Sequence, residues 1–291
     1  MIGFFSNMFG YILNFIYNLV QNYGVAIILF SILIKLAMLP MSIKQQKTMK
    51  KTAKIQGKVK EIQNKYKNDP EKMNREVMDL YKKENMSPFS GCLSVIVQMI
   101  LLFAMFYLVR SPLTHMRKID TESLENYKNE IVQEYGDEKV SKSYPEISII
   151  RNANEKGNED SEFYINMNFL GLDLSNVPQE NYKNLTVYII PILYVISSMI
   201  SIKLTTQMNA KKEEKKDIVI DKEGKKEEDV DMAAQMNKSM AWMMPIMSVS
   251  ISLIAPLGLA LYWLLNNVLM IIEKVILNKV LTEKEEEKIA E

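Results

Sequence analysis

Residues 24–43 read GVAIILFSILIKLAMLPMSI and contain one charged side chain, that of Lys35. A helix crosses the core of a bilayer with about 20 predominantly apolar residues, so this stretch is long enough to span a membrane. No charged side chain occurs in four further stretches: 90–109, 186–202, 240–256 and 257–272. A soluble protein can bury one such helix, but five in one chain predict an all-α polytopic membrane protein with five transmembrane helices.

The overall composition excludes several classes of protein. The chain of 291 residues has 36 basic and 35 acidic side chains, so its bulk charge does not favour binding of a polyanion. A single cysteine, Cys92, and a single histidine, His115, exclude disulfide scaffolds, multi-cysteine metal centres and two-histidine zinc motifs. The sequence contains neither a P-loop nor a G-x-G-x-x-G motif. We therefore expect no metal, no cofactor and no enzymatic activity.

The distribution of charge between the spans predicts the topology. Residues 44–83 contain 13 basic and five acidic side chains, whereas residues 111–185 contain eight basic and 14 acidic ones. Short loops rich in Lys and Arg stay on the cytoplasmic side of a membrane. We therefore expect the first loop in the cytoplasm, the second loop outside, the N-terminus outside and the C-terminus in the cytoplasm.

This topology divides the chain into alternating membrane and loop segments. Residues 1–23 are predicted to form an amphipathic helix at the outer interface, with a sixth span as the alternative. The five spans are expected at 24–43, 90–110, 186–205, 240–256 and 257–277. The remaining segments are a cytoplasmic helical hairpin at 44–89, an external loop with an insertion at 111–185, a charged cytoplasmic linker at 206–239 and a cytoplasmic tail at 278–291.

The basic loop shows the periodicity of two helices. The motif Asn68-Asp69-Pro70 ends the first helix and begins the second, with Asp69 as the N-cap and Pro70 at the first helical position. Apolar residues recur at helical spacing on both sides of this motif: Ile55, Val59, Ile62 and Tyr66 before it, and Met73, Val77 and Leu80 after it. We therefore predict an antiparallel helical hairpin.

Lys35 is the residue most suggestive of function. A charged side chain near the middle of a membrane costs roughly 2.5–3.5 kcal/mol, so it usually faces protein or water. It either snorkels to the inner headgroups or lies in a water-filled polar cavity, and Ser31 shares its face of the helix. Gln98 and Asn266 carry amides that are costly to expose to lipid. Together these residues favour a bundle that encloses a polar groove.

Four stretches of the sequence resemble one known family. They are NYGVAIILFSILIKLAMLPMSIKQQKTMKK (22–51), LYKKENMSPFSGCLSVIVQMILLFAMFYLV (80–109), FLGLDLS (169–175) and MAWMMPIMSVSISLIAPLGLALYWLLNN (240–267). In order and spacing they look like the YidC membrane protein insertases, in the short form that is similar to members from Gram-positive bacteria. The resemblance implies five transmembrane helices around a polar groove that is open to the cytoplasm. Lys35 stands where the family usually has an arginine, and Gln98, Ser201 and Trp263 fall where the groove lining would be expected.

The resemblance also implies a function and partners. A family member would insert hydrophobic helices of nascent membrane proteins into the lipids of the bacterial plasma membrane without nucleotide hydrolysis. The Sec translocon and the ribosome are the implied partners, the latter through the basic hairpin at 44–84 and not through the short acidic tail. Two alternatives stay open: a transporter of small solutes or ions that uses Lys35, and a membrane enzyme with a Ser31–Lys35 dyad.

Overall fold

The computed structural model of the chain describes residues 2–85, 90–213 and 250–290. The chain forms two compact units. Unit 1 comprises Met1–Ala37, Gln98–Ser198 and Ile246–Met270, and unit 2 comprises Met38–Val97, Met199–Pro245 and Ile271–Glu291. Helices dominate the described residues, and a single antiparallel pair of short strands is the one sheet among them.

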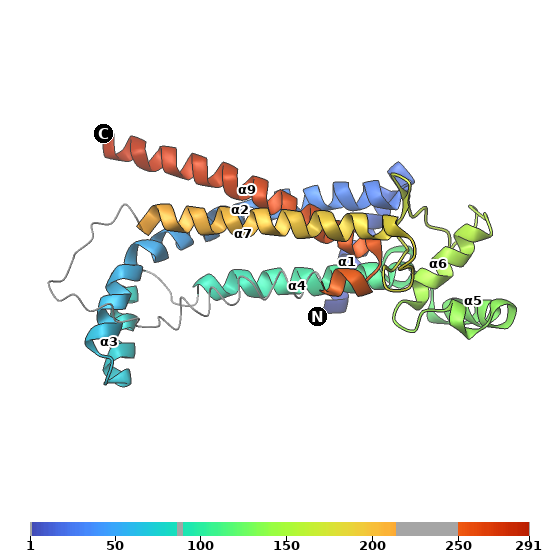
Figure 1. Cartoon of the computed structure of the whole chain (residues 1–291), viewed down its shortest axis with the longest axis horizontal. Helices are drawn as coiled ribbons and strands as arrows, with labels where there is room; N and C mark the ends of the chain where they lie inside the picture. Colours follow the sequence, from blue (N-terminus) through green and yellow to red (C-terminus); the bar gives the residue numbers. More distant parts are fainter. Residues whose placement is uncertain (1, 86–89, 214–249, 291) are drawn as a thin grey trace. The chain divides into compact units, whose positions relative to one another are not determined.

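The elements follow one another along the chain as Figure 1 traces them. The long helices are α1 (Ile2–Val20), α2 (Tyr23–Lys65), α3 (Pro70–Lys83), α4 (Ser90–Arg110), α5 (Thr121–Tyr135), α6 (Pro145–Glu155), α7 (Ile189–Glu213) and α9 (Leu257–Ala290). Short helical turns lie at η1 (Leu113–Arg117), η2 (Asp137–Lys139) and η3 (Leu185–Tyr188). The strands are β1 (Asn168–Phe169) and β2 (Leu172–Asp173).

Three of the described helices are long and apolar enough to cross a membrane: Tyr23–Thr52, Leu185–Leu204 and Leu257–Val280. They coincide with the spans predicted at 24–43, 186–205 and 257–277. The span predicted at 90–110 coincides with α4, in which the apolar helix of described residues is the shorter Met99–Arg110. The span predicted at 240–256 lies largely outside the described residues, as does most of the linker at 206–239.

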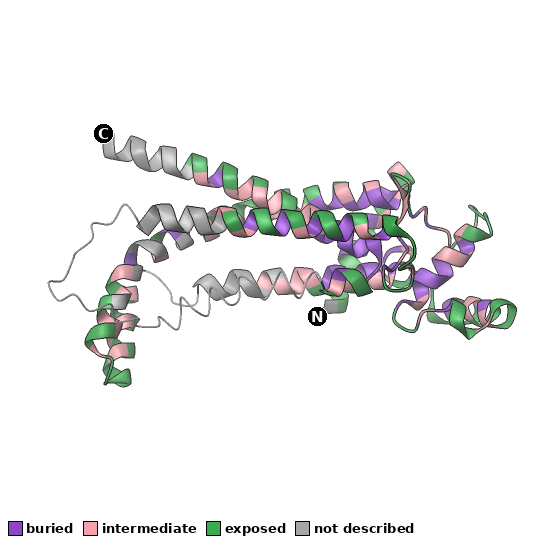
Figure 2. Cartoon of the chain, viewed as in Figure 1, coloured by how far each residue is buried: buried purple, intermediate pink, exposed green. Residues whose placement is uncertain are grey.

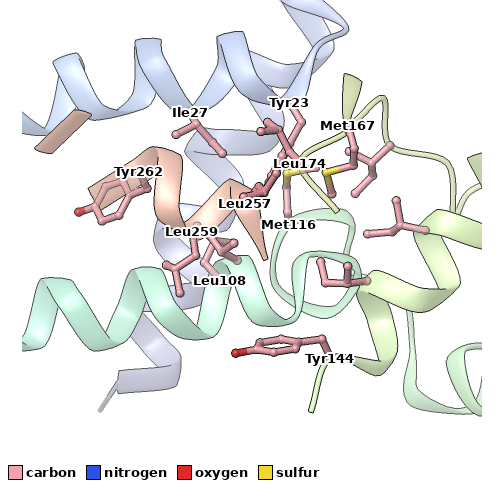
Figure 3. Close-up of a cluster of buried hydrophobic side chains, with 14 of the residues drawn as sticks. Tyr23, Ile27, Leu108, Met116, Tyr144, Met167, Leu174, Leu257, Leu259 and Tyr262 are labelled. Atoms are coloured by element: carbon pink, nitrogen blue, oxygen red, sulfur yellow. The ribbon is translucent and has the colours of Figure 1, made fainter. Parts of the chain in front are cut away.

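The core of unit 1 joins segments that are far apart in the sequence. Figure 3 shows Tyr23 and Ile27 of α2 near Leu257 and Leu259 of α9, with Leu108 of α4 facing them. All five side chains are buried. The first turn of α9 is held by the loop that follows β2: the amides of Leu257 and Gly258 donate to the carbonyls of Asn176 and Leu174, each at 2.9 Å.

The corner between α1 and α2 is clamped by the segment that leads into β1. The amide of Asn166 donates to the hydroxyl of Tyr17 over 2.9 Å, and its carbonyl accepts from the amide of Tyr23 over 3.0 Å. The side chain of Asn22 donates to the carbonyl of Asn168 over 2.7 Å. Gly24 completes the corner, because a Cβ there would collide with the ring of Phe169. The clamp fixes where the apolar span of α2 begins.

The segment between α4 and α7 is an ordered part of unit 1, where the sequence predicted only a loop with an insertion at 111–185. Its helix α6 is largely buried, as Figure 2 shows. Glu146 of α6 accepts hydrogen bonds from the amide and the hydroxyl of Thr114, at 3.0 Å and 2.7 Å. Burial nevertheless raises the pKa of Glu146, because the charged carboxylate loses its hydration.

Unit 2 contains the predicted hairpin. Helix α2 ends at Lys65 and α3 begins at Pro70, and the side chain of Asp69 accepts a hydrogen bond from the amide of Lys72 over 3.0 Å. The predicted N-cap is therefore confirmed. An ion pair of 3.1 Å between Lys58 and Glu84 brings the end of α3 back beside α2, so the chain reverses direction here. Helix α3 has no buried residue (Figure 2).

Candidate functional site

Lys35 and Ser31 lie one turn apart on α2, within unit 1. Ser31 is buried, and its hydroxyl donates to the carbonyl of Ile27 over 2.7 Å. Such a bond to the preceding turn satisfies a serine inside an apolar helix. Lys35 is half-buried, and it is the one charged residue in 24–43. The helix thus presents a single positive charge within a stretch long enough to span a membrane.

A second polar feature joins α7 and α9 within unit 1. The side-chain amide of Asn267 donates to the hydroxyls of Ser197 and Ser198, at 2.9 Å and 3.1 Å. The hydroxyl of Ser197 in turn donates to the carbonyl of Tyr194 over 2.8 Å. All three polar side chains are buried, so the hydrogen bonds remove the cost of burying them.

Trp263 lies one turn before Asn267 on α9 and is also buried. Its ring centroid is 6.4 Å from that of Tyr194, so the two aromatic rings extend the contact between α7 and α9. Among the described residues, the indole nitrogen of Trp263 has no hydrogen-bond partner. Buried donors are nearly always paired, so this nitrogen is an exception among the described residues.

The six residues predicted for the groove belong to both units of the structure. Ser31, Lys35, Trp263 and Asn266 have described side chains in unit 1, where Asn266 is half-buried. Ser201 is buried in unit 2. Gln98 lies on α4, but its side chain is outside the described part of the chain. A shared groove lined by these residues stays a prediction.

Asn267 is the polar residue that sequence reasoning missed. The sequence has two adjacent asparagines, Asn266 and Asn267. The prediction named Asn266, which lies four residues after Tyr262 and so on the same face of the helix. Both asparagines lie about one turn after Trp263, and the rotation of α9 against α7 decides which of them is buried. In the sequence, the adjacent serines Ser197 and Ser198 were the one indication that a polar side chain of another helix packs against α7.

The described residues offer no metal centre: in them, no group of three or more His, Cys, Asp or Glu side chains could hold an ion. Two groups of polar side chains lie on the apolar helices. One comprises Ser31 and Lys35, and the other lies at the contact of α7 with α9. Hydroxyls, amides and one amine in this setting can bind polar groups by hydrogen bonds and charge.

The apolar helices and the polar residues on them define an α-helical membrane protein. The model of one family, the 60Kd inner membrane protein family, matches residues 15–285. The chain therefore belongs to the 60Kd inner membrane protein family.

Several relatives are named "Membrane protein insertase YidC". The protein from Treponema denticola is 26% identical over 269 residues, which is 92% of this chain and 36% of the relative. The protein from Caldanaerobacter subterraneus is 43% identical over 102 residues, 35% of this chain and 50% of the relative. The protein from Chloroherpeton thalassium is 47% identical over 100 residues, 34% of this chain and 17% of the relative. The matches thus span half or less of these relatives.

Proposed function

We propose that this chain is a membrane protein insertase, which moves hydrophobic helices of newly made proteins into the bacterial plasma membrane. The observation that carries the proposal is the single charge of Lys35, half-buried on an apolar helix in a chain of this family. A charge in this setting is costly, and such charges mark sites of transport or binding. The relatives named as insertases favour insertion of proteins over the other kinds of transport or binding.

We place the substrate in a polar groove that opens to the cytoplasm, within a bundle of five transmembrane helices. Lys35 attracts a short acidic or polar segment of the substrate. Ser31, Gln98 and Asn266 offer hydrogen-bonding groups, and the indole nitrogen of Trp263, which has no partner among the described residues, offers a donor. Ser201 belongs to unit 2, so the proposal does not rest on it.

Insertion in this mechanism needs no nucleotide. Each Leu, Ile, Phe or Val of a substrate helix contributes roughly −0.3 to −0.6 kcal/mol on entering the bilayer. A full span of such residues outweighs the brief transfer of a short polar segment through a hydrated groove. The protein then lowers the barrier for that segment without making or breaking a covalent bond.

The topology that accompanies this proposal has the N-terminus outside and the C-terminus in the cytoplasm. Its cytoplasmic hairpin is basic, and Lys65 and Lys72 both lie over the ring of Tyr66, at 5.3 Å and 4.9 Å from its centroid. These cations sit at the turn between α2 and α3. They are suited to anionic lipid headgroups or to the ribosome, and the Sec translocon is the other proposed partner.

The proposal is tested with purified protein in sealed liposomes, without ATP and without any other protein. A short single-span substrate with an acidic tail is added, and protection of the tail from external protease is followed over time. We expect faster protection than in empty liposomes and in liposomes that hold an unrelated helical membrane protein. Equal rates in all three would refute autonomous insertion, and solute flux in the same vesicles would instead favour a transporter.

A further inference from the structure

The turn between β1 and β2 combines strain with exposure. The strands pair Phe169 with Leu172, so Leu170 and Gly171 alone form the turn. Both have positive φ, 52° at Leu170 and 79° at Gly171. Turns of two residues with positive φ favour Asn, Asp or Gly at the first position, and a leucine there is strained. Leu170 is also 87% exposed, so it makes no compensating contact inside the protein.

The hairpin is held at the start of a membrane span. Asn166, two residues before β1, accepts from the amide of Tyr23, and Asn168 accepts from the side chain of Asn22. Tyr23 is the first residue of the apolar span Tyr23–Thr52. The start of a span marks the boundary between headgroups and acyl chains. The base of the hairpin is therefore fixed at that level by hydrogen bonds to the α1–α2 corner.

The residues at the tip of the hairpin favour lipid over water. Residues 166–172, NMNFLGL, carry no charge. The one charged residue of the two strands, Asp173, lies at the base of the hairpin, where its carboxylate accepts from the amide and the hydroxyl of Ser175 at 2.9 Å and 2.7 Å. Leu19, which lies just before the same corner on α1, is 70% exposed. A hairpin with an uncharged tip and an exposed leucine, held at a corner whose preceding helix exposes an apolar side chain, has the mixed polar and apolar character of segments that enter the interface of a bilayer.

We propose that Leu170 is a lipid contact, which inserts into the boundary between headgroups and acyl chains of the leaflet where α2 begins. The turn holds this side chain away from the protein, which explains why a leucine occupies a position that suits asparagine. The contact fixes the depth of the α1–α2 corner in the membrane. The inference requires that α2 spans the bilayer, and it does not depend on insertase activity.

The test measures the environment of residue 170 directly. The native cysteine is removed by Cys92→Ser, Leu170→Cys is added, and a bimane fluorophore is attached to the new thiol. The protein is reconstituted into liposomes of plain phosphatidylcholine or of phosphatidylcholine with brominated acyl chains. Bromine quenches a fluorophore on contact, so we expect at least about twofold lower emission in the brominated liposomes.

The matched control is Asn158→Cys in the same background, at an exposed polar turn after α6. We expect its emission to be equal in the two kinds of liposome. Quenching at residue 170 no greater than at residue 158 would overturn the proposal, including the case in which Leu170 binds another protein. Since Leu170 is so exposed, its replacement by cysteine leaves the core intact, and unchanged thermal unfolding of the labelled protein verifies this.

Discussion

Helices α1 and α3 are both amphipathic, but their exposed faces differ in kind. Helix α1 has no charged side chain, and its exposed face carries large apolar side chains, such as that of Phe15, which is 66% exposed. Half of the 14 residues of α3 are charged, none is buried, and Met78 is an isolated exposed apolar residue at 41%. A large exposed apolar face marks contact with lipid or protein, whereas a charged face is solvated. The difference teaches that amphipathicity alone does not tell which medium surrounds a helix.

The largest expected effect separates the buried face of α1 from the surface of α3. A Cβ at Gly10 would collide with the backbone carbonyl of His115, which cannot move aside as a side chain can. We expect Gly10→Ala to destabilise unit 1 by about 1–3 kcal/mol through overpacking. Asn74→Ala, on the exposed surface of α3, should change stability by less than about 0.5 kcal/mol. Thermal unfolding in lipid nanodiscs measures both, and equal unfolding temperatures would show that α1 does not pack as described.

The exposed faces are compared by the same substitution in each helix. We expect Phe15→Asp to destabilise the protein in nanodiscs by about 1–2 kcal/mol, because a carboxylate is driven from lipid. Met78→Asp should have an effect below about 0.5 kcal/mol, because α3 faces water. The two variants are compared by their thermal unfolding. Similar shifts for both would contradict the assignment of lipid to the exposed face of α1.

The cap of α3 gives a smaller, local effect. Asp69→Ala removes the acceptor for the amide of Lys72, and we expect a loss of about 1 kcal/mol in the stability of the first turn. Hydrogen exchange of that turn should become faster. Asp79→Ala is the control, because its ion pair with Lys82 is exposed and 3.7 Å long. Equal exchange in the two variants would show that the cap does not hold the turn.

The last comparison concerns pH, and it contrasts the buried carboxylate of Glu146, between α4 and α7, with an exposed carboxylate. Burial raises the pKa of Glu146 above the ordinary value of 4.5, so the folded protein binds a proton that the unfolded chain has released. Stability therefore falls as pH rises from about 4.5 through the raised pKa. Glu146→Gln cannot titrate, so we expect its unfolding temperature to fall less across this window. Glu130→Gln, exposed on α5, should retain the wild-type slope, and an unchanged slope in Glu146→Gln would refute the shift.

The sequence predicted the fold best where apolar residues continue over the length of a whole helix or where a local motif marks a helix end. Hydropathy located three helices that are long and apolar enough to cross a membrane, and the Asp69-Pro70 pair located the start of α3. The segment between α4 and α7 escaped prediction because its structure depends on contacts distant in sequence, such as Asn166 with Tyr17 and Glu146 with Thr114. Periodicity carries no information on such contacts.

The candidate site shows the same limit. The sequence singled out Lys35 because a charge in an apolar stretch is visible without a structure. It did not identify the contact of Asn267 with Ser197 and Ser198, because that contact depends on how α9 is rotated against α7. Helical rotation against a neighbour is a tertiary property.

The central claim is that the charge of Lys35 attracts the acidic segment of a substrate, and one measurement tests it most directly. Lys35→Ala and Lys44→Ala are compared with the wild type in the liposome assay, at equal amounts of folded protein. Both variants lose one positive charge from α2, but Lys44 is exposed and lies outside the apolar stretch 24–43. We expect Lys35→Ala to slow insertion of the acidic-tailed substrate by about tenfold, the equivalent of about 1.4 kcal/mol, and Lys44→Ala to have little effect. Insertion by Lys35→Ala at the wild-type rate would contradict the account.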